Sequence, residues 1–242
     1  ESFANSGVKN WSQDIRLTTD QNLAVSGMLG AYYYEQNAQP GWGGDLTGYT
    51  IGGSKVVTPI PTNPDDQTVN KALYGLINWR INDQWTTSLE GRYARDEISK
   101  GGTDVRVLGA NTYRQSYALD KTFSSFTPRW TLSYQARENV NLYGLVSKGN
   151  KPGGFNTDVY RADFQEADRD ALIARGLNTY KEEEAWNYEL GMKSDWLDGT
   201  LRINANLYQI DWTNQQLTET GPVTRKNGSL FSTSYTTNVA ES

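Results

Sequence analysis

The sequence of 242 residues contains no cysteine and no histidine. Without cysteine there are no disulfides, so the redox compartment cannot be argued from them. Without histidine the chain lacks Ser-His-Asp and Cys-His nucleophile systems, histidine-ligated zinc and the commonest general base. Catalysis would have to depend on carboxylates, lysine or tyrosine. We expect no enzyme activity, no metal site and no cofactor.

Long apolar runs and basic runs are also missing. No stretch of about 18 apolar residues occurs, which excludes a transmembrane helix. The net charge is −5 with a pI near 4.9, and no cluster of lysine or arginine interrupts this balance, so nucleic acid is not an expected partner. The first residues, Glu1-Ser2-Phe3-Ala4, have neither the basic start nor the apolar run of a signal peptide.

Aromatic residues and glycine are abundant. The chain has 15 tyrosines, 8 tryptophans and 23 glycines, although only 36% of it is hydrophobic and its mean hydropathy is −0.70. Outer-membrane barrels combine low hydropathy with many aromatics, because one face of each strand lines a wet lumen. A soluble all-β protein that binds sugars shares this composition. Composition alone therefore leaves both classes open.

The hairpin over residues 186–211 gives the sharpest structural signal. Asp198-Gly199 predicts a type I′ turn, because both central residues of that turn need a positive φ. Trp186 and Trp196 then lie on the apolar face, ten residues apart, which is about the span of a tilted strand between two aromatic belts. The other face is polar, with Asp195 opposite Arg202. The expected apolar pairs are Trp196–Leu201, Ser194–Ile203, Met192–Ala205 and Leu190–Leu207.

Four hairpins of this kind are predicted, and long polar connections separate them. The hairpins span about 11–35, 71–95, 124–148 and 186–212, with Leu17 opposite Leu23, Ile77 opposite Leu89 and Trp130 opposite Val146. The long loops are 37–68, 97–121, 149–184 and 214–231, and a ninth strand begins near 232–238. Outer-membrane barrels routinely alternate tight turns with long extracellular loops, whereas compact domains rarely carry four such loops.

The loop over 149–184 carries its own signals. Asp163-Phe164-Gln165-Glu166 predicts a capping box at the start of a short helix, and Gly176 suits the position just after its end. The acidic runs Asp65-Asp66 and Glu182-Glu183-Glu184 are interpreted as solvated charges, with metal binding or acid–base chemistry as the alternative.

Four segments resemble the barrel of TonB-dependent outer-membrane receptors: WSQDIRLTTD, NLYGLVSKGNKPGGFN, EEAWNYELGMKSDWLDGTLRINANLYQIDWTNQQ and SYTTNVAES. The resemblance implies a 22-stranded barrel, plugged by an N-terminal domain, that imports scarce ligands with energy from an inner-membrane complex. We therefore expect residues 1–242 to be a fragment of that family. It would be all-β, an antiparallel transmembrane β-barrel in part, with about eight to nine strands of a larger up-and-down meander and no plug domain.

This resemblance also implies location and partners. The chain would lie in the bacterial outer membrane against lipid, bind a small ligand such as a ferric siderophore, and couple to TonB through the missing plug. Candidate ligand contacts are of two kinds. Arg80, Arg92 and Arg129 face the predicted lumen and suit an anionic ferric chelate, although lumen arginines also bond a plug or water. Trp42, Tyr49 and Phe155 in the loops suit stacking on a sugar or a catecholate.

Two other functions stay open from the sequence. The first is a self-contained outer-membrane pore or adhesin, which requires the ninth strand to close against the first. The second is a soluble carbohydrate-binding protein, which requires two sheets packed face to face with Trp130 and Leu132 buried between them.

Overall fold

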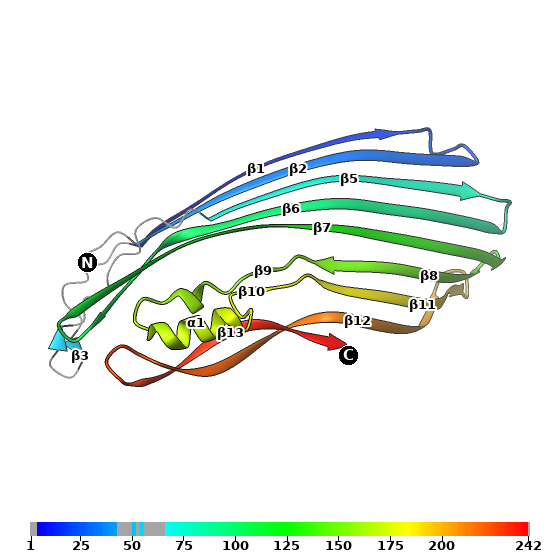
Figure 1. Ribbon diagram of the computed structural model, residues 1–242. Helices are drawn as coiled ribbons and strands as arrows, with labels where there is room; N and C mark the ends of the chain where they lie inside the picture. The colour runs from blue at the N-terminus through cyan, green and yellow to red at the C-terminus, as the bar shows by residue number, and fades with distance from the viewer. Residues whose placement is uncertain (1–3, 43–49, 52–53, 56–65, 242) are drawn as a thin grey trace.

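A computed structural model describes residues 4–42, 50–51, 54–55 and 66–241. Nine long strands form one antiparallel sheet in which neighbours along the chain are neighbours in space, curved like part of a barrel wall (Figure 1). These strands are β1 (Ala4–Thr18), β2 (Val25–Trp42), β5 (Asp66–Arg80), β6 (Trp85–Leu108), β7 (Asn111–Arg137), β8 (Val140–Lys151), β11 (Glu183–Trp196), β12 (Leu201–Thr224) and β13 (Leu230–Glu241).

Short elements occupy the connections. A two-stranded ribbon of β3 (Thr50–Ile51) and β4 (Ser54–Lys55) lies between β2 and β5. The β8–β11 connection holds β9 (Gly154–Phe155), the 3₁₀ helix η1 (Thr157–Tyr160), α1 (Glu166–Ala174) and β10 (Thr179–Tyr180). In the part of the chain that is described, no helix has both the length and the apolarity needed to cross a bilayer.

The sheet is open and a single layer thick over most of its length. Its two edges are β1 and β13, which do not pair with each other in the described residues. Large apolar side chains stand exposed along one face, among them Leu29, Leu190 and Leu207, which are 63%, 69% and 81% exposed. Trp130 is 47% exposed, so the face-to-face sheets of the soluble alternative are absent from the described structure. The all-β, partial-barrel prediction is confirmed.

The predicted pairing is correct in three of the four hairpins. Ile77 lies opposite Leu89, Trp130 opposite Val146, and Leu190 opposite Leu207. At the last turn Asp198 and Gly199 have φ of 52° and 83°, and the amide of Thr200 donates to the carbonyl of Leu197, as a type I′ turn requires.

The register predicted for the first hairpin is wrong. Leu17 pairs with Leu29, six residues beyond the expected Leu23. The reason lies in the turn, where the carboxylate of Asp20 accepts hydrogen bonds from the backbone and side-chain amides of Asn22. This arrangement keeps Leu23 out of the ladder. Because the shift is an even number of residues, every side chain stays on its predicted face.

Strands also extend into segments predicted to be loops. Residues 97–108 and 111–121 continue β6 and β7 as a paired ladder out to Leu108 and Asn111, so a long hairpin replaces the predicted loop over 97–121. The strand β12 likewise continues to Thr224, within the predicted loop 214–231. An antiparallel ladder needs paired backbone groups and does not need an apolar face, so the loss of hydrophobic alternation did not end these strands.

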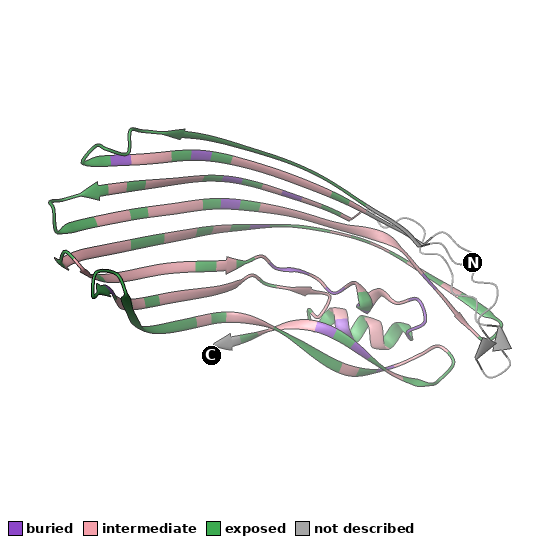
Figure 2. Cartoon of the chain, turned by 180° about the vertical axis from the view of Figure 1, so that it is seen from behind, coloured by how far each residue is buried: buried purple, intermediate pink, exposed green. Residues whose placement is uncertain are grey.

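The strand β8 ends at Lys151 and β11 begins only at Glu183, so both are shorter than β7 and β12 at this end of the sheet. The segment between them fills the space that this leaves. Figure 1 shows α1 between β7 and the β12–β13 hairpin. Buried residues concentrate on this segment and on the hairpin beside it (Figure 2). Val159, Phe164 and Leu172 pack there against Val223 and Tyr235. The residues 152–182, named here the wall segment, are therefore a folded element with a small core.

Candidate ligand-facing site

The helix of the wall segment begins and ends differently from the sequence prediction. The residue at the N-cap position is Gln165, and its side chain makes no capping bond, so the predicted capping box from Asp163 is wrong. The C-terminal prediction is correct. Gly176 has a φ of +76°, and the amides of Gly176 and Leu177 donate to the carbonyls of Ile173 and Leu172. This pattern is a Schellman motif, which needs a left-handed residue at that place.

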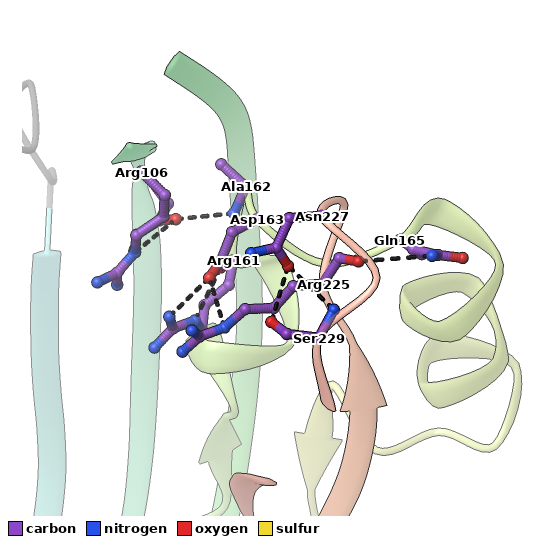
Figure 3. Close-up of polar contacts among 9 residues, drawn as sticks. Arg106, Arg161, Ala162, Asp163, Gln165, Arg225, Asn227 and Ser229 are labelled. Atoms are coloured by element: carbon purple, nitrogen blue, oxygen red, sulfur yellow. Dashed lines mark hydrogen bonds and ion pairs between the residues drawn. The ribbon is translucent and has the colours of Figure 1, made fainter. Parts of the chain in front are cut away.

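Asp163 binds two arginines instead of capping the helix. Its side chain is 2% exposed, Arg161 Nε and Nη2 donate to its two oxygens at 3.1 and 3.0 Å, and Arg225 Nε lies 3.2 Å from Oδ2 (Figure 3). Burial alone would raise the pKa of the Asp163 carboxyl, but the hydrogen bonds and the positive charges of Arg161 and Arg225 lower that pKa below its usual value. Asp163 therefore stays ionised at neutral pH.

The two guanidinium groups also stack on aromatic rings. Arg225 and Arg161 lie 4.1 and 4.4 Å from the ring centroid of Phe231, and Arg161 lies 5.4 Å from that of Phe164. A ring face carries partial negative charge, so these contacts stabilise the cations where they are partly dehydrated. Two cations share one carboxylate, which leaves this cluster, named here the Arg–Asp clasp, with a net positive charge.

The wall segment is anchored to the β12–β13 hairpin through backbone and side-chain bonds. The side-chain amide of Asn156 both accepts from the amide of Thr236 and donates to its carbonyl, at 2.8 Å each. The amide of Gln165 donates to the carbonyl of Thr224, and the carboxylate of Asp168 accepts from the amide of Thr224. Thr224 lies on β12 beyond the last residue that pairs with β11, so at this place the segment satisfies backbone groups that lack a neighbouring strand.

The wall segment also contacts the β6–β7 hairpin. The amide of Ala162 donates to Asp104 Oδ2 at 2.8 Å (Figure 3). Tyr160 stacks on Tyr117 with ring centroids 5.5 Å apart. The segment therefore bridges two hairpins that the sequence places far apart.

A second cluster lies midway along β5 and β6, on the polar face. The guanidinium of Arg92 lies 5.3 Å from the ring centroid of Tyr32 and 5.9 Å from that of Tyr74. Its Nη2 donates to the side-chain oxygen of Asn70 at 3.0 Å, and Asn70 in turn donates to Asp96. Arg92 is thereby held by Asn70 beside two tyrosine rings, an arrangement suited to planar anionic or aromatic ligands.

Of the six predicted contact residues, the four whose side chains are described, Arg80, Arg92, Arg129 and Phe155, do not line one pocket. Arg92 and Arg129 are near neighbours, since Arg92 pairs with Thr127, two residues before Arg129. Arg129 lies 4.0 Å from Glu90. Arg80 is exposed at the last position of β5, beside the tight turn, at the opposite end of the strand from the wall segment.

The loop aromatics among those six are only partly described. Phe155 lies in β9, opposite Thr179 at the base of the wall segment. Trp42 is the last residue of β2, and its side chain lies outside the described part of the structure, as does the whole of Tyr49. The Arg–Asp clasp was not predicted from the sequence, because Arg225 is distant in sequence from Arg161 and Asp163 and no local motif joins them.

A match to a protein-family model identifies the family of this chain. The model of the TonB dependent receptor-like β-barrel matches residues 2–242. The chain belongs to this family. Its members are proteins of the bacterial outer membrane, so the apolar face of the sheet is its lipid-facing surface and the polar face lines the lumen. The tight turns lie at the periplasmic end, and the long hairpins with the wall segment lie at the extracellular end.

Solved structures show the same fold. The ferric yersiniabactin uptake receptor FyuA from Yersinia pestis has a TM-score of 0.61 at 16% identity, covering 90% of this chain and 32% of that one. The hemophore receptor HasR of Serratia marcescens, in complex with HasA and heme, has a TM-score of 0.58 at 12% identity, covering 100% and 39%. For the alcaligin receptor FauA from Bordetella pertussis the values are 0.54, 14%, 98% and 34%. The chain thus spans about a third of the length of these structures.

Proposed function

We propose that this chain is the ligand-facing barrel wall of a receptor that imports a siderophore-like or other small nutrient across the outer membrane, with energy supplied through TonB. Ligand would be captured at the extracellular end and released into the lumen by rearrangement of a plug, without chemistry on the ligand. The observation that carries this proposal is the family match over residues 2–242.

The chemistry of the lumen face supports a small, partly anionic ligand. Arg92 lies beside the rings of Tyr32 and Tyr74, and Arg129 lies close by on the next strand. The Arg–Asp clasp adds two partly exposed guanidinium groups at the extracellular end. A ferric catecholate or hydroxamate offers planar groups and negative oxygens that fit both features.

The test is uptake by cells that carry or lack the intact protein. Four probes are compared: a ferric catecholate, a ferric hydroxamate, hemin and copper(II), each with a radioactive metal. We expect the protein to raise uptake of one probe, and a protonophore that collapses the inner-membrane gradient to abolish the gain. Uptake that persists in de-energised cells would indicate a passive pore, and no gain with any probe would reject this substrate class.

A further inference from the structure

The lipid-facing surface contains a groove whose floor is formed by two glycines and a proline. Across β5, β6 and β7, Gly75 pairs with Gly91 and Gly91 pairs with Pro128, so three adjacent strands present glycine or proline at one level. All three positions are on the apolar face, because residues two positions away on these strands are the exposed Ile77, Leu89 and Trp130.

Large apolar side chains stand on both sides of this floor. One wall is the cross-strand row Ile77, Leu89 and Trp130, and the other is the row Leu73, Tyr93 and Phe126. These six side chains are 47–62% exposed, and the ring of Phe126 leans toward Gly91. Five of them, all but Trp130, line a hollow of about 860 Å³ that continues across the floor to Leu29 on β2 and Leu17 on β1.

Each floor residue has a local reason to be small. A Cβ on Gly91 would lie 3.2 Å from the ring of Phe126, and one on Gly75 would lie 3.2 Å from the backbone oxygen of Met28. Pro128 has no N–H to donate, and the pairing of β7 with β8 begins one residue after it, at Arg129. The floor is therefore the backbone of two glycines and the compact ring of Pro128, held within a paired sheet.

We propose that this groove is a binding site for one fatty acyl chain of a membrane lipid. The occupant follows from continuity with the lipid-facing surface, because bilayer hydrocarbon is the medium around every wall residue. The row from Leu29 on β2 to Pro128 crosses three strand spacings, about 14 Å, so it is long enough for an extended stretch of acyl chain to lie along it.

Packing explains why a chain would stay in the groove longer than in bulk lipid. Lipid tails are as apolar as leucine, so the gain is not hydrophobic. A rigid, empty groove forfeits dispersion contacts on its floor and walls, and a chain lying in it restores them. The aromatic side chains of Tyr93 and Phe126 line the hollow and offer large contact surfaces to such a chain.

Native mass spectrometry of the intact protein tests the site. The protein is extracted in mild detergent, supplied with a phosphatidylethanolamine that carries two 16-carbon chains, and activated by graded collision energy. We expect the wild type to keep one lipid at energies that remove all others. The double variant Gly75→Leu/Gly91→Leu fills the groove and should lose that lipid several-fold more readily, whereas Ala205→Leu, on the lipid face of β12, should retain it.

A second variant protects the test against misfolding, since leucine at Gly91 must displace Phe126. Tyr93→Ala/Phe126→Ala removes one wall without crowding the sheet, and it should also lose the retained lipid. Release of all lipids from the wild type at one energy would overturn the proposal as an adventitious association only. Retention of the lipid by both folded double variants would overturn it too, because the lipid would then lie elsewhere.

Discussion

Replacing Asp163 with alanine should loosen the wall segment while leaving the barrel strands folded. The change removes a carboxylate that is 2% exposed and leaves Arg161 and Arg225 without their counter-charge. Breaking a fully buried ion pair from one side costs about 3–5 kcal/mol. Both arginines are partly exposed, at 16% and 25%, so water offsets part of that loss. We expect a local cost of about 2–3 kcal/mol.

Hydrogen exchange read by mass spectrometry measures this cost directly. Exchange from a locally opened state speeds up tenfold for each 1.4 kcal/mol, so the amides of residues 156–177 should exchange about thirty- to a hundredfold faster. The amides of β5 and β6 should not change. The matched control is Asp170→Ala on the same helix, whose side chain is 68% exposed and pairs loosely with Arg169. That control should cost below about 1 kcal/mol.

The same carboxylate makes the segment sensitive to acid. The pKa of Asp163 is lowered in the folded state, so its stabilisation is complete above the unfolded value near 4 and is lost as pH falls below it. After correction for intrinsic exchange rates, protection of the segment should fall as the pH drops below about 4 in the wild type and should fall less in Asp163→Asn. Equal exchange in wild type and Asp163→Ala at pH 7 would refute the clasp as the device that holds the segment.

Three further predictions concern the two faces of the sheet. Leu190→Arg, on the lipid face, should lower the free energy of unfolding in bilayers by about 2–4 kcal/mol, whereas Asn204→Arg on the lumen face should change it little. Equal losses in the two variants would contradict the assignment of the faces. Lys193→Cys should react readily with small polar thiol reagents in the purified barrel and Met192→Cys should be protected, so equal rates would contradict this register. Arg92→Ala should reduce uptake of an anionic chelate while Arg80→Ala, beside the periplasmic turn, does not; unchanged uptake in Arg92→Ala would exclude it as a ligand contact.

The lipid-facing half of the structure followed from local pattern. In the hairpin over 186–211, the positive φ needed at Asp198 and Gly199 defines the turn, and alternation then fixes which side chains share a face. The first hairpin shows the limit of this reasoning. Several turns of similar length are compatible with the alternation around residue 20, and the hydrogen bonds of the Asp20 side chain selected one that the pattern did not reveal.

The sequence by itself determined the class of fold, the two faces of the sheet and the family, because side-chain alternation and turn residues are local and survive in any register that keeps parity. Tertiary structure decided the extracellular end. There the strands β6, β7 and β12 continue without an apolar face. The carboxylate of Asp163, which the local sequence predicts to cap a helix, pairs instead with Arg225 from a distant hairpin. Such pairings depend on which backbone edges and charges meet in space, and a linear pattern does not contain that information.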